Sequence, residues 1–118
     1  MKILFVEDNA RFARLAMTQF LAPHEVVLVP SVAEALEMLG EQTFDVVLID
    51  FDLSDGKGAI VAQTAGQLTP KPFIVAVSSH DEGNAQLMSA GADVICSKMR
   101  FSAIISVLEA RFGASGSA

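Results

Sequence analysis

The sequence contains no tryptophan, no tyrosine and only one cysteine, Cys96. A single cysteine excludes an internal disulfide framework and is typical of a reducing compartment. The missing Trp and Tyr make the chain a poor candidate for a protein that stacks nucleic-acid bases on aromatic side chains. These absences argue against a secreted disulfide scaffold and against a single-strand nucleic-acid platform.

Positive charge is also scarce, because eight Lys and Arg residues stand against fourteen Asp and Glu residues, for a net charge of −6. The cations form no basic stripe, so direct nucleic-acid binding lacks its usual electrostatic driving force. No apolar run approaches the roughly 18 residues of a membrane span. Residues 1–8 lack the longer apolar core and the cleavage site of a secretory signal. We therefore expect a cytoplasmic protein that binds neither nucleic acid nor a membrane.

Short apolar runs alternate with helix-like segments along the 118 residues, of which 52% are hydrophobic. That length supports one domain with a real core. The runs are continuously apolar, which predicts strands covered on both faces, as in a parallel sheet. Strands are predicted at Ile3–Val6, Val26–Val29, Val46–Ile49, Phe73–Val77 and Val94–Cys96, and helices at Ala10–Leu21, Val32–Gly40, Gly58–Leu68, Glu82–Ala90 and Ala103–Phe112. We expect one domain over residues 1–112 and a flexible tail over residues 113–118.

Several residues mark the ends of these helices. The segment Ser31–Glu34 has the S-x-x-E spacing of a capping box. We expect Asp81 and Ser102 to cap the fourth and fifth helices, and Gly40 and Gly91 to lie where helices end. Strands that alternate with helices in this way predict a doubly wound α/β fold with right-handed crossovers.

Polar side chains follow four of the five predicted strands. In an open parallel sheet, functional sites form beyond the carboxyl ends of the strands. The residues at those ends are Glu7 and Asp8, then Asp50 and Asp52, then Ser78 and Ser79, and finally Lys98. Each alone has an ordinary explanation as a turn, cap or surface residue, so the prediction depends on their joint placement.

The chemistry of this set points to phosphoryl transfer. Clustered carboxylates repel one another unless a cation is present, and Mg²⁺ accepts oxygen ligands while leaving room for a phosphoryl oxygen. Lys98 can pair with a carboxylate or with a phosphoryl group, and Ser78 can donate a hydrogen bond to one. Asp50 is then a plausible nucleophile.

In order and spacing, these residues resemble the receiver domain of two-component response regulators over residues 1–112. The matching features are the opening strand and acidic pair in Lys2–Asn9, the phosphoacceptor strand Asp45–Asp50, the glycine at Gly58, the switch hydroxyl at Ser78 with the small Ser79 beside it, the A-G-A-D turn at Ala90–Asp93, and the lysine at Lys98. The set is more specific than any one of its members.

The resemblance implies a flavodoxin-like (βα)5 three-layer sandwich with strand order 2-1-3-4-5. It implies that Glu7, Asp8, Asp50 and the backbone carbonyl of Asp52 hold Mg²⁺. It also implies that Asp50 accepts a phosphoryl group from the phosphohistidine of a histidine kinase or a histidine phosphotransfer protein. Such a receiver is a signalling switch with limited autophosphorylation and autodephosphorylation activity, and is not an enzyme in the usual sense.

Some positions depart from the family pattern. Ser54 and Met99 replace common prolines, and Ile95 stands where an aromatic switch residue is usual. Asp52 adds a carboxylate near the site. These departures concern the conformational readout more than the phosphorylation, and we expect modulatory roles for Asp52, Ser79, His80, Ile95 and Met99.

Two helix faces are candidate contact surfaces. On the first helix Arg11, Arg14 and Thr18 share a face that we expect to meet the kinase or phosphotransfer protein, or else to be simply solvated. We expect Phe12, Leu15, Ala16 and Phe20 to face the sheet. The last helix carries more apolar residues than one buried stripe needs, namely Ile104, Ile105, Val107, Leu108 and Phe112, so it is a candidate surface for a downstream partner or a homodimer.

Some features of the sequence also resemble those of other functional classes. Residues 50–54 resemble the D-x-D-x-T loop of haloacid-dehalogenase-like phosphatases, but that loop follows the first strand in that family and the third strand here. A receiver-like interaction module that is never phosphorylated is a further alternative. A calcium loop fails on spacing, and a dinucleotide site lacks its glycine fingerprint. Because no output domain is evident, we expect either a partner protein to read the switch or the chain to be part of a larger protein.

Overall fold

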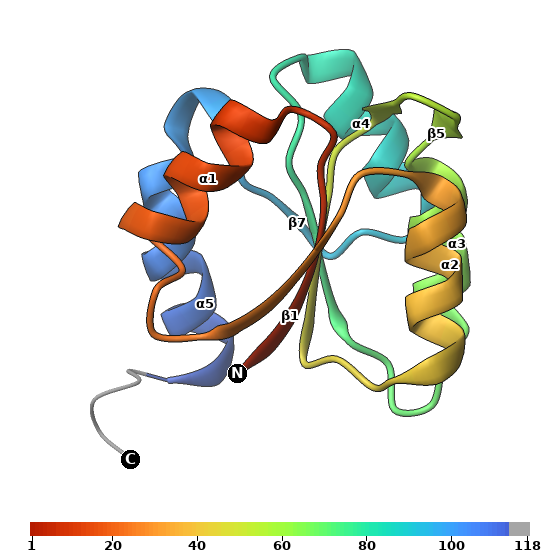
Figure 1. The fold of residues 1–118 in the computed structure, drawn as a ribbon, viewed down its shortest axis with the longest axis horizontal. Coiled ribbons are helices and arrows are strands. Elements are labelled where there is room, and N and C mark those ends of the chain that lie inside the picture. Colours follow the sequence, from red (N-terminus) through yellow and green to blue (C-terminus); the bar gives the residue numbers. More distant parts are fainter. Residues whose placement is uncertain (114–118) are drawn as a thin grey trace.

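A five-stranded parallel sheet forms the centre of the molecule (Figure 1). The computed structural model describes residues 1–113. The strands are β1 (Lys2–Val6), β2 (Glu25–Val29), β3 (Val46–Ile49), β6 (Phe73–Ala76) and β7 (Val94–Ile95), in the order β2-β1-β3-β6-β7. Counted within this sheet alone, that is the predicted order 2-1-3-4-5. The fold class is therefore confirmed.

Helices cover both faces of the sheet, as Figure 1 shows for α1 and α5 on one side and α2 and α3 on the other. The helices are α1 (Ala10–Gln19), α2 (Val32–Glu41), α3 (Ala59–Gly66), α4 (Asp81–Ala90) and α5 (Ile104–Phe112). Successive residues of a strand point to opposite faces, so Leu4 and Val6 pack against α2, α3 and α4 while Ile3 and Phe5 pack against α1 and α5. Burial on both faces explains why the strands read as unbroken apolar runs.

The predicted helix ends are correct in part. Ser31 caps α2 as predicted, since its hydroxyl accepts the N–H of Glu34 at 3.1 Å and donates to the Glu34 carboxylate at 3.1 Å. Gly91 is the C-cap residue of α4. The prediction for Gly40 is wrong by one residue, because α2 continues to Glu41.

The predicted caps at Asp81 and Ser102 are wrong. Asp81 is already the first residue of α4, and the N-cap residue is His80, whose side chain makes no capping hydrogen bond. Asp81 instead places a negative charge in the first turn, where the helix dipole favours it. Ser102 lies inside a 3₁₀ helix, η1 (Lys98–Ala103), which leads directly into α5.

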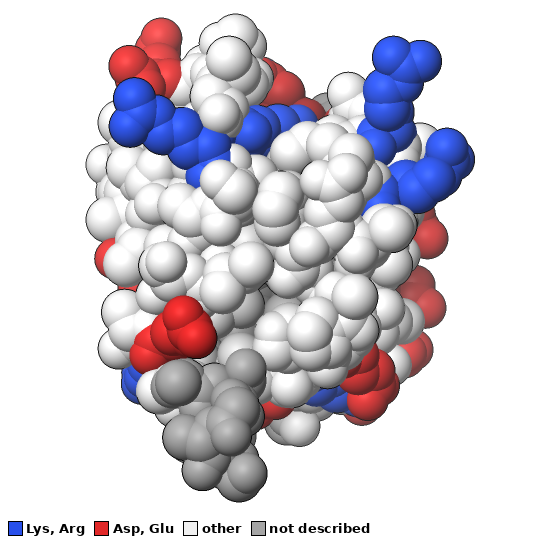
Figure 2. Space-filling model, turned by 90° about the vertical axis from the view of Figure 1, so that its left-hand side faces the viewer, with Lys and Arg blue, Asp and Glu red and all other residues white. Residues whose placement is uncertain are grey.

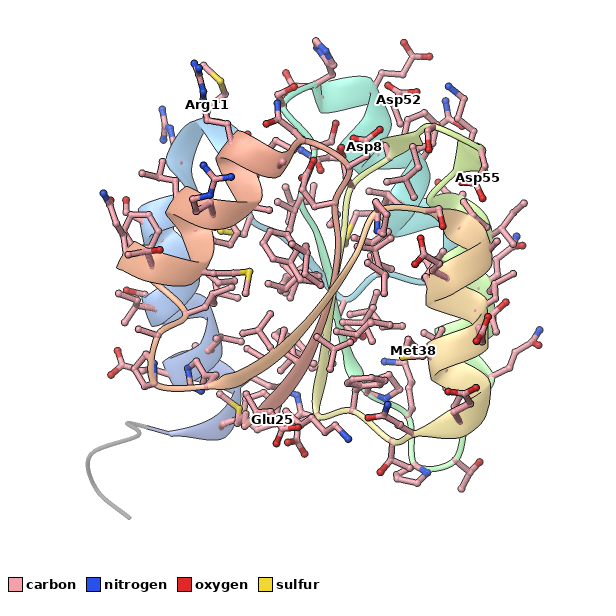
Figure 3. The ribbon with its side chains drawn as sticks, viewed as in Figure 1. Asp8, Arg11, Glu25, Met38, Asp52 and Asp55 are labelled. Atoms are coloured by element: carbon pink, nitrogen blue, oxygen red, sulfur yellow. The ribbon has the colours of Figure 1, made fainter. Side chains whose placement is uncertain are left out.

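A small hairpin that we did not predict follows the third sheet strand. Its strands are β4 (Asp52–Leu53) and β5 (Gly56–Lys57). The Asp55 carboxylate in its turn accepts the backbone N–H groups of Val32 at 2.8 Å and Ala33 at 3.0 Å. The hairpin is thus tied to the N-terminus of α2, and Figure 3 shows Asp55 beside the start of that helix.

One orientation on α1 also differs from the prediction. Ala16 is buried against the sheet, but Leu15 is 48% exposed. Leu15 lies one position from Ala16 and therefore about 100° around the helix, which turns it toward Arg11 and Arg14. Among residues 1–113, no helix is long and apolar enough to cross a membrane. Apart from Gly113, the predicted tail lies outside the described residues.

Candidate functional site

Three carboxylates meet beyond the ends of β1 and β3. Oxygen atoms of Glu7, Asp8 and Asp50 all lie within 4.8 Å of one another. Glu7 and Asp50 are buried, whereas Asp8 is exposed. Figure 3 shows Asp8 and Asp52 at the same end of the sheet. The parallel register, which pairs Val6 with Ile49, places these acids together.

Lys98, which follows β7 in the sequence, lies against this cluster. Its Nζ lies 2.9 Å from Glu7 Oε2 and 2.9 Å from Asp50 Oδ2. It also lies 5.2 Å from the centroid of the Phe12 ring on α1, within the range of a cation–π contact. Burial opposes the charge of Lys98, but the hydrogen bonds to Glu7 and Asp50 outweigh it, so its pKa is raised. The lysine therefore remains a cation at neutral pH.

The single positive charge of Lys98 does not fully compensate the negative charges of the buried acids. Burial raises the pKa of Glu7 to about 7, with a further contribution from the charge of Asp50, even though hydrogen bonds with Lys98 and with the Asn9 N–H act in the opposite direction. Glu7 Oε1 is buried and has no hydrogen-bond partner among the described residues. An orphaned carboxylate oxygen beside two further acids is the donor set that suits a hard divalent cation such as Mg²⁺.

The backbone around Asp50 is tightly constrained. Its Oδ1 accepts the N–H of Phe51 at 2.8 Å, and the N–H of Gly58 donates to the Phe51 carbonyl at 2.7 Å. A Cβ atom at position 58 would lie 2.0 Å from the Asp50 carbonyl oxygen. Only glycine permits that approach, which gives a physical reason for the glycine eight residues after the predicted acceptor.

Ser78 lies two residues beyond the end of β6 and is buried. Its hydroxyl accepts the backbone N–H of His80 at 3.1 Å. The side chain of Asn84 on α4 binds the Ser78 backbone on both sides, at 2.9 Å and 3.1 Å. Sequence reasoning missed Asn84, although an asparagine inside a predicted helix is a weak helix former and so a signal of a local role.

The predicted modulatory residues divide into two groups. Asp52 and His80 line one depression of about 430 Å³ beside the acidic cluster, and Asp52 also pairs with the exposed Lys57. Ser79 next to His80 is exposed. Ile95 and Met99, by contrast, have 47% and 78% of their surface exposed. They lie on the outer surface and do not belong to the acidic pocket.

Comparison with known sequences gives a consistent result. Residues 3–109 match the profile of the response regulator receiver domain. The chain is 30% identical over 82 residues to the sensor protein TorS of Escherichia coli, covering 68% of this chain and 9% of that protein. It is 31% identical over 88 residues to the sensory transduction protein LytR of Streptococcus agalactiae, covering 69% of this chain and 35% of that protein. The chain thus spans only part of the length of these curated relatives.

Solved structures share the fold. A CheY-like response regulator receiver domain from Methanospirillum hungatei superimposes with a TM-score of 0.80 at 20% identity, covering 99% of this chain and 98% of that one. The BeF3-activated receiver domain of DrrB superimposes with a TM-score of 0.78 at 22% identity, covering 94% of this chain and 95% of that one. At these identities the likeness concerns the fold.

Proposed function

The chain belongs to the response regulator receiver domain family, whose members are phosphoaspartate switches of two-component signalling, and we propose that Asp50 is the phosphoacceptor here. The observation that carries the proposal is the position of Lys98, whose Nζ lies 2.9 Å from both Asp50 and Glu7. The ion pair with Lys98 fixes the position of the Asp50 carboxylate at the carboxyl end of the sheet. A carboxylate held in this way is a ready nucleophile toward phosphorus.

We infer that Glu7, Asp8, Asp50 and the backbone carbonyl of Asp52 hold Mg²⁺, because the acids converge and Glu7 Oε1 lacks a partner. When bound, the ion offsets the negative charge that gathers as a phosphoryl group approaches three carboxylates. An Asp50 oxygen forms the new bond to phosphorus as the bond to the donor nitrogen breaks. Lys98 and the Ser78 hydroxyl then donate hydrogen bonds to the phosphoryl oxygens.

Receiver domains are phosphorylated by histidine kinases, and we propose that this chain takes its phosphoryl group from such a kinase or from a histidine phosphotransfer protein. The contact surface we assign is the exposed face of α1, where Arg11, Arg14, Leu15 and Thr18 line a groove of about 600 Å³. Figure 2 shows the side formed by α1 and α5 as a broad uncharged area with Lys and Arg side chains along its upper margin. An apolar surface flanked by cations suits a partner helix with apolar and acidic residues.

For the output we propose the face formed by α4, β7 and α5. Ile95 and Met99 are exposed there. On α5, Ile104 and Leu108 are buried in the core, whereas Ile105 is exposed on the side that faces Phe20 and His24. This supports the prediction that the last helix carries apolar residues beyond its buried stripe. This face is a candidate contact surface for a downstream protein or for a second copy of the chain. We also propose that the protein works in the cytoplasm.

Family membership excludes the haloacid-dehalogenase-like phosphatase, because the acceptor loop follows β3 and the match to the receiver family covers residues 3–109. The remaining alternative is a receiver that works by contact alone. Intact-mass measurement after treatment with acetyl phosphate and Mg²⁺ separates the two. We expect the mass gain of a single phosphoryl group, which is absent in Asp50→Asn and in excess chelator. Glu37→Gln, at an exposed acid on α2, is the matched control and should retain the gain. An equal gain in Asp50→Asn would refute the assignment.

A further inference from the structure

The first turn of α4 is packed directly onto Ser78. Asp81 and Glu82 at the start of the helix are exposed, but Gly83 and Asn84 are buried. Asn84 as a whole is only 2% exposed. A buried amide needs hydrogen-bond partners, and those partners come from the residue that we assign as the switch.

The Asn84 side-chain amide hydrogen-bonds to both the N–H and the carbonyl of Ser78. The Ser78 N–H donates to Asn84 Oδ1 at 2.9 Å, and Asn84 Nδ2 donates to the Ser78 carbonyl at 3.1 Å. The same carbonyl also accepts the backbone N–H of Lys98 at 3.3 Å. The peptide groups of Ser78 are thus hydrogen-bonded both to α4, through Asn84, and to the start of η1, through Lys98.

Gly83 brings the helix backbone against the Ser78 hydroxyl. A Cβ atom at position 83 would lie 2.8 Å from Ser78 Oγ and 3.0 Å from Phe51 Cβ. Any other residue would displace the hydroxyl or the Phe51 ring. Gly83 thus leaves room for the Ser78 hydroxyl, and Asn84 binds the Ser78 backbone.

We propose that Asn84 is a positioning residue that couples Ser78 to α4, an inference that rests on the proposed function. When the hydroxyl is drawn toward a phosphoryl group on Asp50, any shift of the Ser78 backbone must either break two buried hydrogen bonds or carry the first turn of α4 along. Breaking them leaves buried polar groups unpaired, which is the costlier course. The first turn of α4 therefore moves with the switch residue.

This coupling supplies an output route that needs no aromatic residue on the fifth strand. Ile95 stands at the usual aromatic position, and its β-branched side chain has few rotamers. It is 47% exposed rather than inserted behind Ser78. The amide link runs from the phosphorylation site to α4 without passing through Ile95.

The test is NMR-detected amide exchange with beryllium fluoride and Mg²⁺ as the phosphoryl mimic. In the native chain, we expect the mimic to shift the Ser78 amide resonance and to change exchange across residues 81–87. In Asn84→Ala, we expect the Ser78 amide still to respond, while the change across 81–87 becomes about tenfold smaller, as for the loss of a buried hydrogen-bonded link. Gln86→Ala, which removes an exposed amide from the same helix, should respond like the native chain.

A second measurement needs no substitution. In the native chain, the Nδ2 protons of Asn84 should stay slow to exchange and should shift together with the Ser78 amide when the mimic binds. An α4 response in Asn84→Ala equal to that of the native chain, or Nδ2 protons that become freely exchanging as Ser78 shifts, would overturn the coupling while leaving Asp50 as the acceptor. If the native chain shows neither a Ser78 shift nor a phosphoryl mass gain, the proposed function fails and the coupling with it.

Discussion

Lys98 is the residue on which the electrostatics of the site depend. Its ammonium group pairs with Glu7 and Asp50, whose side chains are 0% and 8% exposed. Removing it leaves two buried carboxylates facing each other without a cation. We expect Lys98→Met to lower the free energy of unfolding by about 2–4 kcal/mol in excess chelator, as for a buried ion pair that loses one partner. Urea unfolding measures this loss, and added Mg²⁺ should restore part of it.

A matched lysine provides the control. Lys71 pairs with Asp93 at 2.8 Å, but the two side chains are 42% and 34% exposed. Solvent screens such a pair, so Lys71→Met should cost less than about 1 kcal/mol. Equal losses in the two variants would show that the Lys98 cluster is no more than a surface ion pair.

Asp52 should control the lifetime of the phosphorylated state. It shares a depression of about 430 Å³ with His80, beside the acidic cluster. There its carboxylate can repel the new charge or orient an attacking water molecule. We expect Asp52→Asn to change the rate of phosphoryl loss severalfold. Its stability should change by no more than about 0.5 kcal/mol, because the pair with Lys57 is exposed. An unchanged rate of decay would remove Asp52 from the mechanism.

The acids and the lysine of the site could be predicted from sequence because each follows a strand of unmistakable apolar composition. Asn84 could not be predicted in the same way. Its role depends on the distance between the first turn of α4 and the end of β6, and that distance is set by the packing of the helix. A residue whose partners are backbone atoms of another element leaves in the sequence only the weak signal of a poor helix former inside a helix.

At the scale of elements, the β4–β5 hairpin depends on one carboxylate. Hydrogen bonds from the N–H groups of Ala33 and Val32 hold the pKa of Asp55 below its usual range. A lowered pKa in the folded state means that the stabilisation is present above the pKa of the unfolded chain, about 4, and is lost as the pH falls through the folded-state value. We expect Asp55→Ala to lower the unfolding temperature at pH 7 and to differ less from the native chain in acid.

Thermal unfolding of both proteins across this pH range checks the prediction. The control is Glu37→Ala, at an exposed acid on α2. It should shift the unfolding temperature at pH 7 less than Asp55→Ala does. A difference between Asp55→Ala and the native chain that persists unchanged below pH 3 would show that the carboxylate charge is not what holds the hairpin to α2.

The exposed face of α1 should affect phosphoryl transfer from a protein donor but not from a small-molecule donor such as acetyl phosphate. Arg11 and Arg14 flank the exposed Leu15 in the α1 groove, and charge reversal there would repel an acidic partner. We expect Arg11→Glu combined with Arg14→Glu to slow phosphoryl transfer from a cognate phosphohistidine protein by at least about tenfold. Labelling by acetyl phosphate should be unchanged. Equal impairment of both routes would indicate a damaged site instead of a lost contact.

At the scale of the whole molecule, the parallel sheet and the two helix layers could be predicted because β1, β3 and β6 lie in the middle of the sheet and are covered on both sides. The strand order followed only from the resemblance to receiver domains. The β4–β5 hairpin and η1, which follow β3 and β7, could not be predicted. The hairpin forms around the turn at Ser54 and Asp55, and η1 forms where Phe101 packs among Phe5, Phe12 and Phe20. Both depend on contacts between segments far apart in the sequence, which local periodicity does not record.

If Asp50 is the phosphoacceptor, the phosphorylated protein carries an acyl phosphate at position 50, and the position of that group can be determined chemically. After treatment with acetyl phosphate and Mg²⁺, borohydride reduces an aspartyl phosphate to homoserine, which peptide mass spectrometry then locates in the chain. We expect the reduced residue at position 50 alone, with none in excess chelator. Reduction at Glu7, Asp8 or Asp52 in place of Asp50, or labelling that survives on a different side chain such as His80, would show that Asp50 is not the acceptor.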